Sequence, residues 1–314
     1  MTHQPFDSFD NNVLQRYEKV SKVRKLPGLF DDSSSDVWEI QGICFEDSSK
    51  LINYVIKSHQ VSDPSSFWQG MDLLFKRSIC NSYRDAKTTY TFIDALTDLK
   101  IPQVCDVLFG KTHCALVLEK IYGESIQTTE VSDSLVKQLA KFLAEMHSHP
   151  VTKMGAIATE AEVQKSLSQE LKTWQQDVLL TIQALVSEEL AKSPWVIGAL
   201  KNTSDLTIKD IVPLMMDLRW DQFSQIEGEL MGVFDLDAFV FAPIELDFVI
   251  LEYLLTAQQL TIFKKAYEEE GANDLSVPSI AKVRNVYRVL FFLINALGEE
   301  DIDKWMNQPC FFDD

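Results

Sequence analysis

Two aspartates in the segment 211–238 stand at positions suited to acid–base or metal chemistry. Asp217 follows the apolar run IVPLMM, and Asp235 follows the apolar run LMGVF. A carboxylate at the end of an apolar strand is costly to bury unless it is paired or binds a cation. A turn containing Gly228 joins the two runs, so we expect both acids at neighbouring strand ends, facing one cleft. Asp217 would then accept a proton from a nucleophile, while Asp235 would bind a divalent metal, which prefers carboxylate oxygens.

Far upstream, Lys57 ends another apolar run, LINYVIK. A fixed cation at this position can meet phosphate oxygens. One ammonium and two carboxylates are the minimal side chains for phosphoryl transfer, in which catalysis consists mainly of positioning and charge neutralisation. A lysine at a strand end is commonly just solvated, so position alone assigns Lys57 no function.

The first part of the chain is predicted to form a small α+β lobe that positions this lysine. β-Branched and aromatic residues at 36–45 and 51–57 indicate an antiparallel hairpin. A helical pattern follows from Phe67 to Leu96. Short strands at 103–109 and 113–121, joined by a glycine turn, complete the lobe.

The rest of the chain is predicted to be mainly helical. Apolar residues at helical spacing indicate helices at 132–147 and within 161–190, and the last seventy residues end in a loose acidic tail, FFDD. A connector lies near 118–123. We therefore expect a nucleotide-binding lobe at 1–120 and a helical lobe with the catalytic loop and the acceptor site at 121–314.

Composition excludes several classes of protein. The 314 residues carry 29 Lys and Arg against 47 Asp and Glu, a net charge of -18. Such an acidic surface repels nucleic-acid backbones and anionic membranes, so we expect neither as a partner. The five cysteines show no disulfide or zinc spacing, and no secretory signal or apolar run long enough for a membrane is evident. These features indicate a cytoplasmic protein with reduced cysteines.

Taken together, these motifs resemble the aminoglycoside phosphotransferase/choline kinase family of small-molecule kinases. The resemblance covers residues 25–270 and rests on MMDLRWDQF, GVFDLD, ELDF, VLEKIYGES and LAKFLAEMHSHP, in the family's order. It implies an α+β, bilobal protein-kinase-like fold, with a small antiparallel-sheet N-lobe and a mainly helical C-lobe. It also implies ATP and Mg²⁺ as cofactors.

The resemblance also implies roles for individual residues. Asp217 would be the catalytic base. Nucleotide binding would use Lys57 on the α- and β-phosphates, with Asp85 as its partner, and the connector backbone at Glu119 and Ile121 around adenine. Metal binding would use Asp235 and Gln222, while Asp237 would be either a second metal contact or a loop cap.

Several positions depart from the family pattern. Met215 and Met216 replace a His-Gly pair, and Gln222 replaces the metal-binding Asn. The expected phosphate-covering loop, PGLFDDSSSDVW, contains only Gly28 and carries two acids, Asp31 and Asp32.

Other residues receive structural assignments. Asp247 is expected to pair with a backbone group or an arginine such as Arg219, and His147 to be a satisfied histidine at a helix end. Trp174 and Trp195 are expected in the core, with a minor possibility that they line the acceptor pocket.

The leading hypothesis is a Mg²⁺-dependent phosphotransferase that moves the γ-phosphate of ATP to a hydroxyl of a small molecule. One alternative is a catalytically impaired relative that binds nucleotide or a partner protein, favoured by the altered catalytic loop. A metal-dependent hydrolase is a third, which leaves Lys57 and the connector unexplained. The negative charge is compatible with a cationic acceptor, and the sequence leaves open the acceptor, the choice between ATP and GTP, and the oligomeric state.

Overall fold

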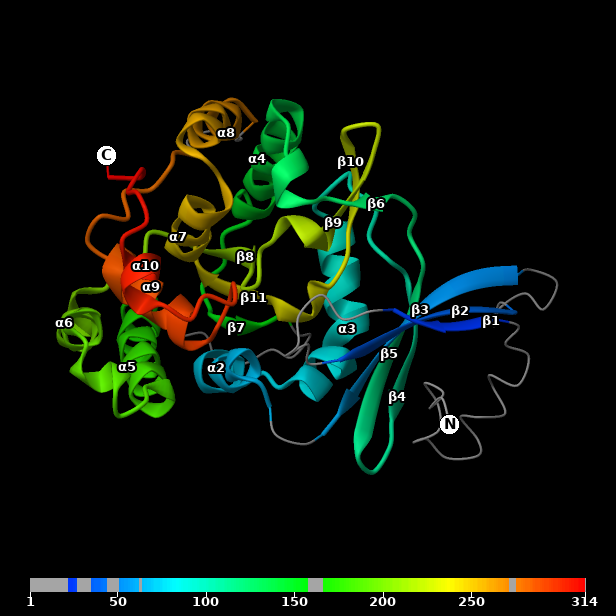
Figure 1. Cartoon of the computed structure of the whole chain (residues 1–314), viewed down its shortest axis with the longest axis horizontal. Helices are drawn as coiled ribbons and strands as arrows, with labels where there is room; N and C mark the ends of the chain where they lie inside the picture. The colour runs from blue at the N-terminus through cyan, green and yellow to red at the C-terminus, as the bar shows by residue number, and fades with distance from the viewer. Residues whose placement is uncertain are drawn as a thin grey trace.

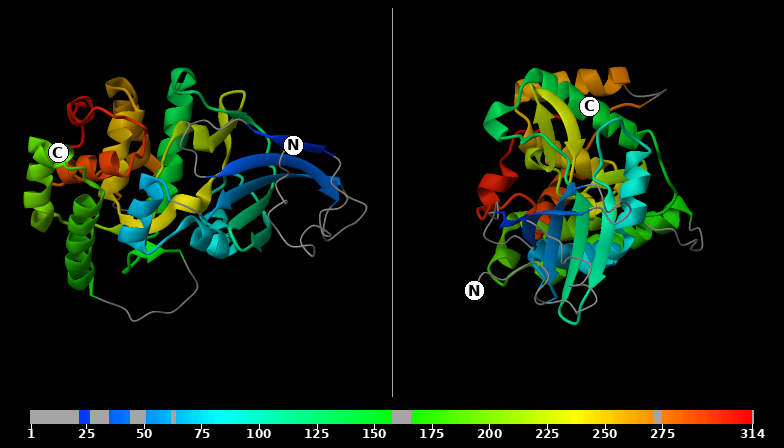
Figure 2. Two further views of the ribbon diagram at one scale, coloured as in Figure 1. Left: turned by 60° about the horizontal axis from the view of Figure 1, so that its bottom comes forward. Right: turned by 90° about the vertical axis from the view of Figure 1, so that its right-hand side faces the viewer.

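The computed structural model describes residues 22–26, 35–43, 51–61, 64–157, 166–270 and 275–313. A twisted sheet forms one end of the molecule and most of the helices form the other (Figure 1). Figure 2 shows the same separation from two further directions. This bilobal arrangement confirms the predicted fold class, while the lobe boundary at residue 120 stays a prediction.

The sheet lobe contains five antiparallel strands in the order β1-β2-β3-β5-β4. Their bounds are β1 Lys22–Lys25, β2 Asp36–Ile43, β3 Leu51–Gln60, β4 Val104–Phe109 and β5 His113–Glu119. Along β5, Ala115 and Val117 pack on one face of the sheet, while Leu116 and Leu118 join the main core on the other. This alternation has the period of two expected for a strand. Both predicted hairpins are confirmed, and Lys57 lies opposite Leu116.

The predicted helical region after β3 is two helices rather than one. Helix α2 spans Ser66–Phe75 and helix α3 spans Ile79–Asp94. The break occurs at Lys76, whose backbone is left-handed (φ 55°), and Ser78 then caps α3 by accepting a hydrogen bond from the Asn81 N–H. Helix α3 packs between the sheet and the helical lobe, whereas α2 packs against the helical lobe (Figure 1).

A disulfide joins α3 to β5 through Cys80 and Cys114. The expectation of fully reduced cysteines is therefore wrong for this pair. The two residues are 34 positions apart and belong to no spacing motif, so only the packing of α3 on the sheet brings them together. No helix among the described residues is long and apolar enough to cross a membrane.

Two small sheets carry the segments around the two aspartates. Strands β10 (Glu229–Val233), β9 (Phe223–Ile226) and β6 (Glu124–Ser125) form one, and β7 (Gly155–Ala156), β11 (Phe239–Pro243) and β8 (Ile211–Met215) form the other. The turn at Gly228 joins β9 to β10. Strand β8, which precedes Asp217, pairs with β11 instead. The prediction that the aspartates end neighbouring strands is therefore wrong, because the first apolar run belongs to a different sheet.

The remaining helices form the body of the helical lobe. They are α4 Asp133–His147, α5 Leu167–Leu185, α6 Pro194–Asn202, α7 Glu245–Leu254, α8 Ala257–Glu270, α9 Arg284–Leu293 and α10 Ile302–Met306. Short 3₁₀ turns occur at Thr128–Glu130 (η1), Leu190–Lys192 (η2), Thr203–Asp205 (η3), Trp220–Gln222 (η4) and Leu236–Ala238 (η5). Ser132 caps α4 by accepting a hydrogen bond from the Leu135 N–H.

Two polar networks hold this lobe together. His147 lies between the Tyr267 hydroxyl and the Asp247 carboxylate, at 2.8 and 2.9 Å. Asp247 is thus structural, as predicted, although its partner is a histidine rather than Arg219. The acidic tail is not loose: Glu252, buried beneath it, accepts a hydrogen bond from the Phe311 N–H, and Arg284 pairs with Asp313.

Candidate active site

A cavity of about 850 Å³ lies between the two lobes. This volume is at the upper end of the range for small-molecule sites. Much of its lining comes from β1–β3 and the connector on one side, and from the loops after β8 and β10 on the other; the start of α2 and residues 295–298 also contribute. Of the predicted site residues, Lys57, Glu119, Ile121, Asp217, Gln222, Asp235 and Asp237 all line it. The folded chain therefore brings together residues that are widely separated in sequence.

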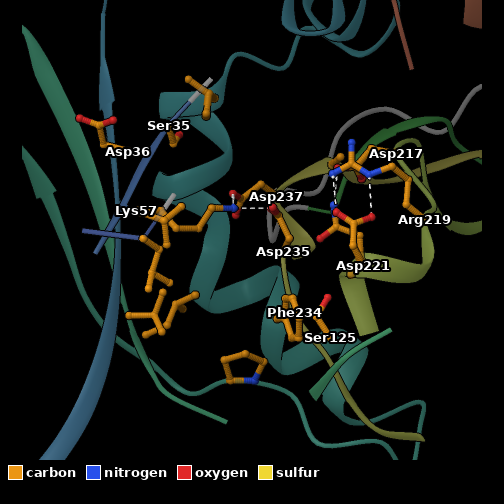
Figure 3. Close-up of a pocket in the computed structure, with 18 of the residues that line it drawn as sticks. Ser35, Asp36, Lys57, Ser125, Asp217, Arg219, Asp221, Phe234, Asp235 and Asp237 are labelled. Atoms are coloured by element: carbon orange, nitrogen blue, oxygen red, sulfur yellow. Dashed lines mark hydrogen bonds and ion pairs between the residues drawn. The ribbon is translucent and has the colours of Figure 1, made fainter. Parts of the chain in front are cut away.

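At the centre of the cavity, Lys57 points from β3 toward the loop after β10 (Figure 3). Its ammonium forms ion pairs with both Asp235 and Asp237. Burial lowers the pKa of Lys57, but the two carboxylates outweigh burial, so the pKa lies well above its ordinary value. Lys57 is therefore a permanent cation that connects the two lobes.

The loop after β10 has an unusual backbone at its first acid. Asp235 is left-handed (φ 69°, ψ 53°), a conformation in which Asp is among the few tolerated non-glycine residues. Burial acts to raise its pKa, yet the Lys57 ammonium brings the pKa below its ordinary value. Burial raises the pKa of Asp237 to about 6, despite the opposing effect of Lys57. Asp235 is thus the carboxylate that stays charged and partly open to the cavity.

Asp217 lies in the loop after β8, beside Gln222. Its Oδ2 atom accepts a hydrogen bond of 3.2 Å from Gln222 Nε2. Within the described parts of the chain, its buried Oδ1 atom has no hydrogen-bond partner. Burial, reinforced by the negative charge of Asp235, raises the pKa of Asp217 to about 7. A carboxylate with this pKa can accept a proton near neutral pH.

Arg219 and Asp221 form a second charged pair beside Asp217 (Figure 3). The guanidinium donates two hydrogen bonds to the Asp221 carboxylate, at 3.0 and 3.3 Å. The extra negative charge that the sequence places beside Gln222 is therefore neutralised locally. The positive charge of Arg219 also lowers the pKa of Asp217, although burial has the larger effect.

Asp85 does not partner Lys57 in this structure. It pairs with Arg77, at 3.6 Å, and neither residue is part of the cavity lining. Arg77 is buried and donates a hydrogen bond of 3.2 Å to the Asp237 backbone carbonyl. Tyr90 of α3 accepts a hydrogen bond from the Leu236 N–H. The Lys57 partner comes from the loop after β10 because α3 supports that loop instead of reaching the lysine.

The connector forms an apolar slot at the other end of the cavity. Ile121 lines it together with side chains of the sheet and of the loop after β10, namely Val37, Val55, Leu118 and Phe234. The Lys120 N–H donates to the Asn53 carbonyl at 2.8 Å, which ties the connector to β3.

The expected phosphate-covering loop lies largely outside the described residues, which include neither Gly28 nor Asp31 and Asp32. Ser35, at its end, lines the cavity and shares a hydrogen bond of 2.9 Å with the Tyr83 hydroxyl.

The two tryptophans considered for the acceptor pocket lie elsewhere. Trp174 is buried and donates to Tyr287, while Trp195 donates to Asp303.

The donor set fits Mg²⁺ on its chemistry. This ion is usually held by one or two carboxylates together with substrate phosphates and water. Asp235 supplies a charged carboxylate at the cavity, and Gln222, whose amide nitrogen is used by Asp217, retains its carbonyl oxygen as a donor. No group of three or more His, Cys, Asp or Glu side chains suited to a metal occurs among the described residues.

Comparisons with known proteins agree with the predicted fold. The sequence matches no known family profile and no curated protein. Solved structures do match. Macrolide 2′-phosphotransferase MphH from Brachybacterium faecium has a TM-score of 0.56 at 14% identity, over 96% of this chain and 98% of the other. A mutant aminoglycoside 2′-phosphotransferase IIIa in complex with GDP has a TM-score of 0.57 at 15% identity, covering 94% and 91%.

An ADP-bound aminoglycoside phosphotransferase is similar at a TM-score of 0.53 and 17% identity, covering 95% of this chain and 96% of the other. At such low identities the likeness concerns the fold. The chain has the bilobal kinase-like fold of small-molecule phosphotransferases, and the predicted resemblance is confirmed at that level.

Some lining residues were not predicted from the sequence. Phe234 and Arg219 lie directly beside predicted residues, so their position in the motifs was an available signal. A further wall, formed by the start of α2 and by residues 295–298, carries no local motif. Only the folded chain brings that wall to the cavity.

Proposed function

We propose that this protein transfers the γ-phosphate of ATP to a hydroxyl group of a small molecule, with Mg²⁺ as cofactor. The observation that carries the proposal is the convergence of Lys57, Asp235 and Asp217 on one cavity beside an apolar slot. A permanent cation, a charged carboxylate and a carboxylate with a pKa of about 7 are the groups that phosphoryl transfer requires.

In this proposal, the adenine lies in the slot at Ile121 and Phe234, and the connector backbone near Glu119 contacts its edge. Lys57 exchanges carboxylate oxygens for oxygens of the α- and β-phosphates. Asp235 and Gln222 hold Mg²⁺, which neutralises charge on the phosphates when bound. Asp237 continues to brace the lysine.

Asp217 orients the acceptor hydroxyl and takes its proton. The acceptor oxygen forms a bond to the γ-phosphorus as the bond from that phosphorus to the bridging oxygen of ADP breaks. The proton moves to Asp217, whose Oδ1 atom lacks another partner among the described residues. The side chains of Met215 and Met216, which replace the His-Gly pair, are buried and pack in the core.

A thermal-shift titration tests the nucleotide site. ATP at 100 times its dissociation constant should add about 2.7 kcal/mol to the free energy of unfolding. The stabilisation should require Mg²⁺ and should weaken in Asp235→Asn, with the exposed Asp98→Asn as a matched control. No Mg²⁺-dependent stabilisation would contradict the proposal. Stabilisation without ADP release in the presence of any acceptor would instead favour the nucleotide-binding alternative.

A further inference from the structure

The wall of the cavity that faces away from the connector is uncharged. Ser65, Phe67 and Trp68 at the start of α2 form part of it, and residues 295–298, just after α9, form the rest. Within the described residues, every charged side chain that lines the cavity comes from β1–β3, the connector, or the loops after β8 and β10. The wall therefore differs in chemistry from the rest of the cavity.

Close packing makes this wall one unit. Gly70 of α2 lies against Ile294, and a β-carbon at Gly70 would be 2.4 Å from Ile294 Cγ2. Phe67 meets Trp68 edge to face, with ring centroids 5.6 Å apart, and is only partly buried. Leu297 is also partly buried, which leaves an aromatic and an aliphatic side chain available at the cavity surface. We call Phe67, Trp68, Ala296 and Leu297 the apolar wall.

The apolar wall lines the same cavity as Asp217 and the slot at the connector. In the view of Figure 3, Phe234 and Ser125 of the slot lie below Asp235, whereas Asp217 and Arg219 lie to its right. A nucleotide that fills the slot and reaches Lys57 leaves the space between Asp217 and the apolar wall for the second substrate. This argument rests on the proposed function, because that function assigns the slot to the nucleotide.

The nearby acids are not available to a cationic acceptor. Asp221 is bound by Arg219. Glu299, two residues after Leu297, pairs with Lys304 and does not line the cavity. Asp217 and Asp235 are needed for the reaction itself. An acceptor with several ammonium groups would find no uncommitted carboxylate among the described residues of this wall.

We propose that the acceptor is an uncharged hydroxylated molecule with an apolar ring or chain, such as a glycoside with an apolar aglycone. Its apolar part packs on Phe67 and Leu297, while its hydroxyl reaches Asp217. The overall negative charge of the chain thus does not indicate a cationic acceptor, because the excess acids lie outside this wall.

Three probes test the proposal by ligand-observed NMR on the full chain with Mg²⁺ and ADP: phenyl β-D-glucoside, methyl β-D-glucoside and the polycation kanamycin. Burial of the phenyl ring should make the phenyl glucoside bind about tenfold more tightly than the methyl glucoside. Kanamycin should bind more weakly than either. Equal or absent binding of the two glucosides, or tighter binding of kanamycin, would overturn the proposal.

Variants of the wall separate this proposal from the proposed function. Phe67→Ala should abolish the preference for the phenyl glucoside while ADP affinity stays unchanged. Leu297→Asp should improve kanamycin binding, whereas the uncharged Leu297→Asn should not. A loss of ADP binding in the unmodified protein would contradict the phosphotransferase proposal. Normal ADP binding with a preference for kanamycin would contradict only the apolar acceptor.

Discussion

The position of Asp217 was predicted from the sequence, whereas its raised pKa is revealed only by the structure. The motif places it at the base position, while burial and the charge of Asp235 raise its pKa to about 7. Because a general base must be deprotonated, turnover should increase as the pH rises from about 6 to 8. Asp217→Asn should lower turnover about 10²–10⁴-fold and remove this increase. Rates of ADP release across this pH range check the prediction, and a variant that keeps both rate and pH profile would contradict it.

The same residue should make stability depend on pH. Its pKa is about 3.8 before burial and about 7 in the folded chain, so the folded state holds a proton that the unfolded state has lost. Its contribution to stability is therefore fully present below about pH 4 and is lost as the pH rises to 7. Asp217→Asn should raise the free energy of unfolding by about 1–2 kcal/mol at pH 8 and by roughly a third of that amount at pH 5. Urea denaturation at both pH values measures this difference, with Asp98→Asn as the exposed control.

At the scale of elements, Arg77, in the turn between α2 and α3, supports the loop after β10. Arg77→Met removes the donor to the Asp237 carbonyl and leaves Asp85 without its cation. We expect affinity for Mg²⁺·ATP to fall about tenfold, because a hydrogen bond from a charged group contributes about 1.5–3 kcal/mol. Asp85→Asn keeps the Arg77 bond and should have a smaller effect. Equal losses in both variants, measured by calorimetry, would contradict this prediction and assign the effect to the Arg77–Asp85 pair as a whole.

A second element-scale feature is the close contact between β10 and the segment that leads into β4. A β-carbon on Gly232 would be 2.7 Å from the Lys100 carbonyl oxygen, which belongs to the backbone and cannot easily move. Gly232→Ala should therefore lower the free energy of unfolding by about 1–3 kcal/mol. Gly198 in α6 has open space around it, so Gly198→Ala should be neutral or stabilising. Chemical denaturation should therefore show a lower free energy of unfolding for Gly232→Ala and an unchanged or higher one for Gly198→Ala.

These elements also show which parts of the fold can be predicted from the sequence. Alternating and helical patterns predicted the sheet hairpins and α4, because local periodicity reports which face of an element is buried. The pairing of β8 with β11, the break at Lys76 and the partner of Lys57 were not predicted. Each depends on which surfaces meet in the folded chain, and a single sequence carries no local signal for that. The sequence revealed most of the site residues because they lie in short motifs of adjacent residues. The apolar wall, in contrast, is assembled from segments that are far apart in the sequence.

At the scale of the whole molecule, the Cys80–Cys114 disulfide closes a long loop of chain between β5 and α3. A cross-link over 34 residues should contribute about 3–4 kcal/mol by restricting the unfolded state. Reductant should therefore lower the melting temperature, and Cys80→Ala combined with Cys114→Ala should remove the response. Mass spectrometry after alkylation should detect two additional thiols upon reduction. The absence of additional thiols would show that the pair is reduced from the start.

The double ion pair of Lys57 affects how an inactive variant should be chosen. Replacing this lysine would leave Asp235 and Asp237 facing each other in a largely buried space without a compensating cation, so the lobes would tend to separate or to recruit a cation from the buffer. A loss of activity in such a protein would not distinguish a failure to bind phosphate from a displacement of the sheet lobe. Asp217→Asn, which removes a buried negative charge and keeps the lysine bridge, is the more informative loss-of-function reference for this chain.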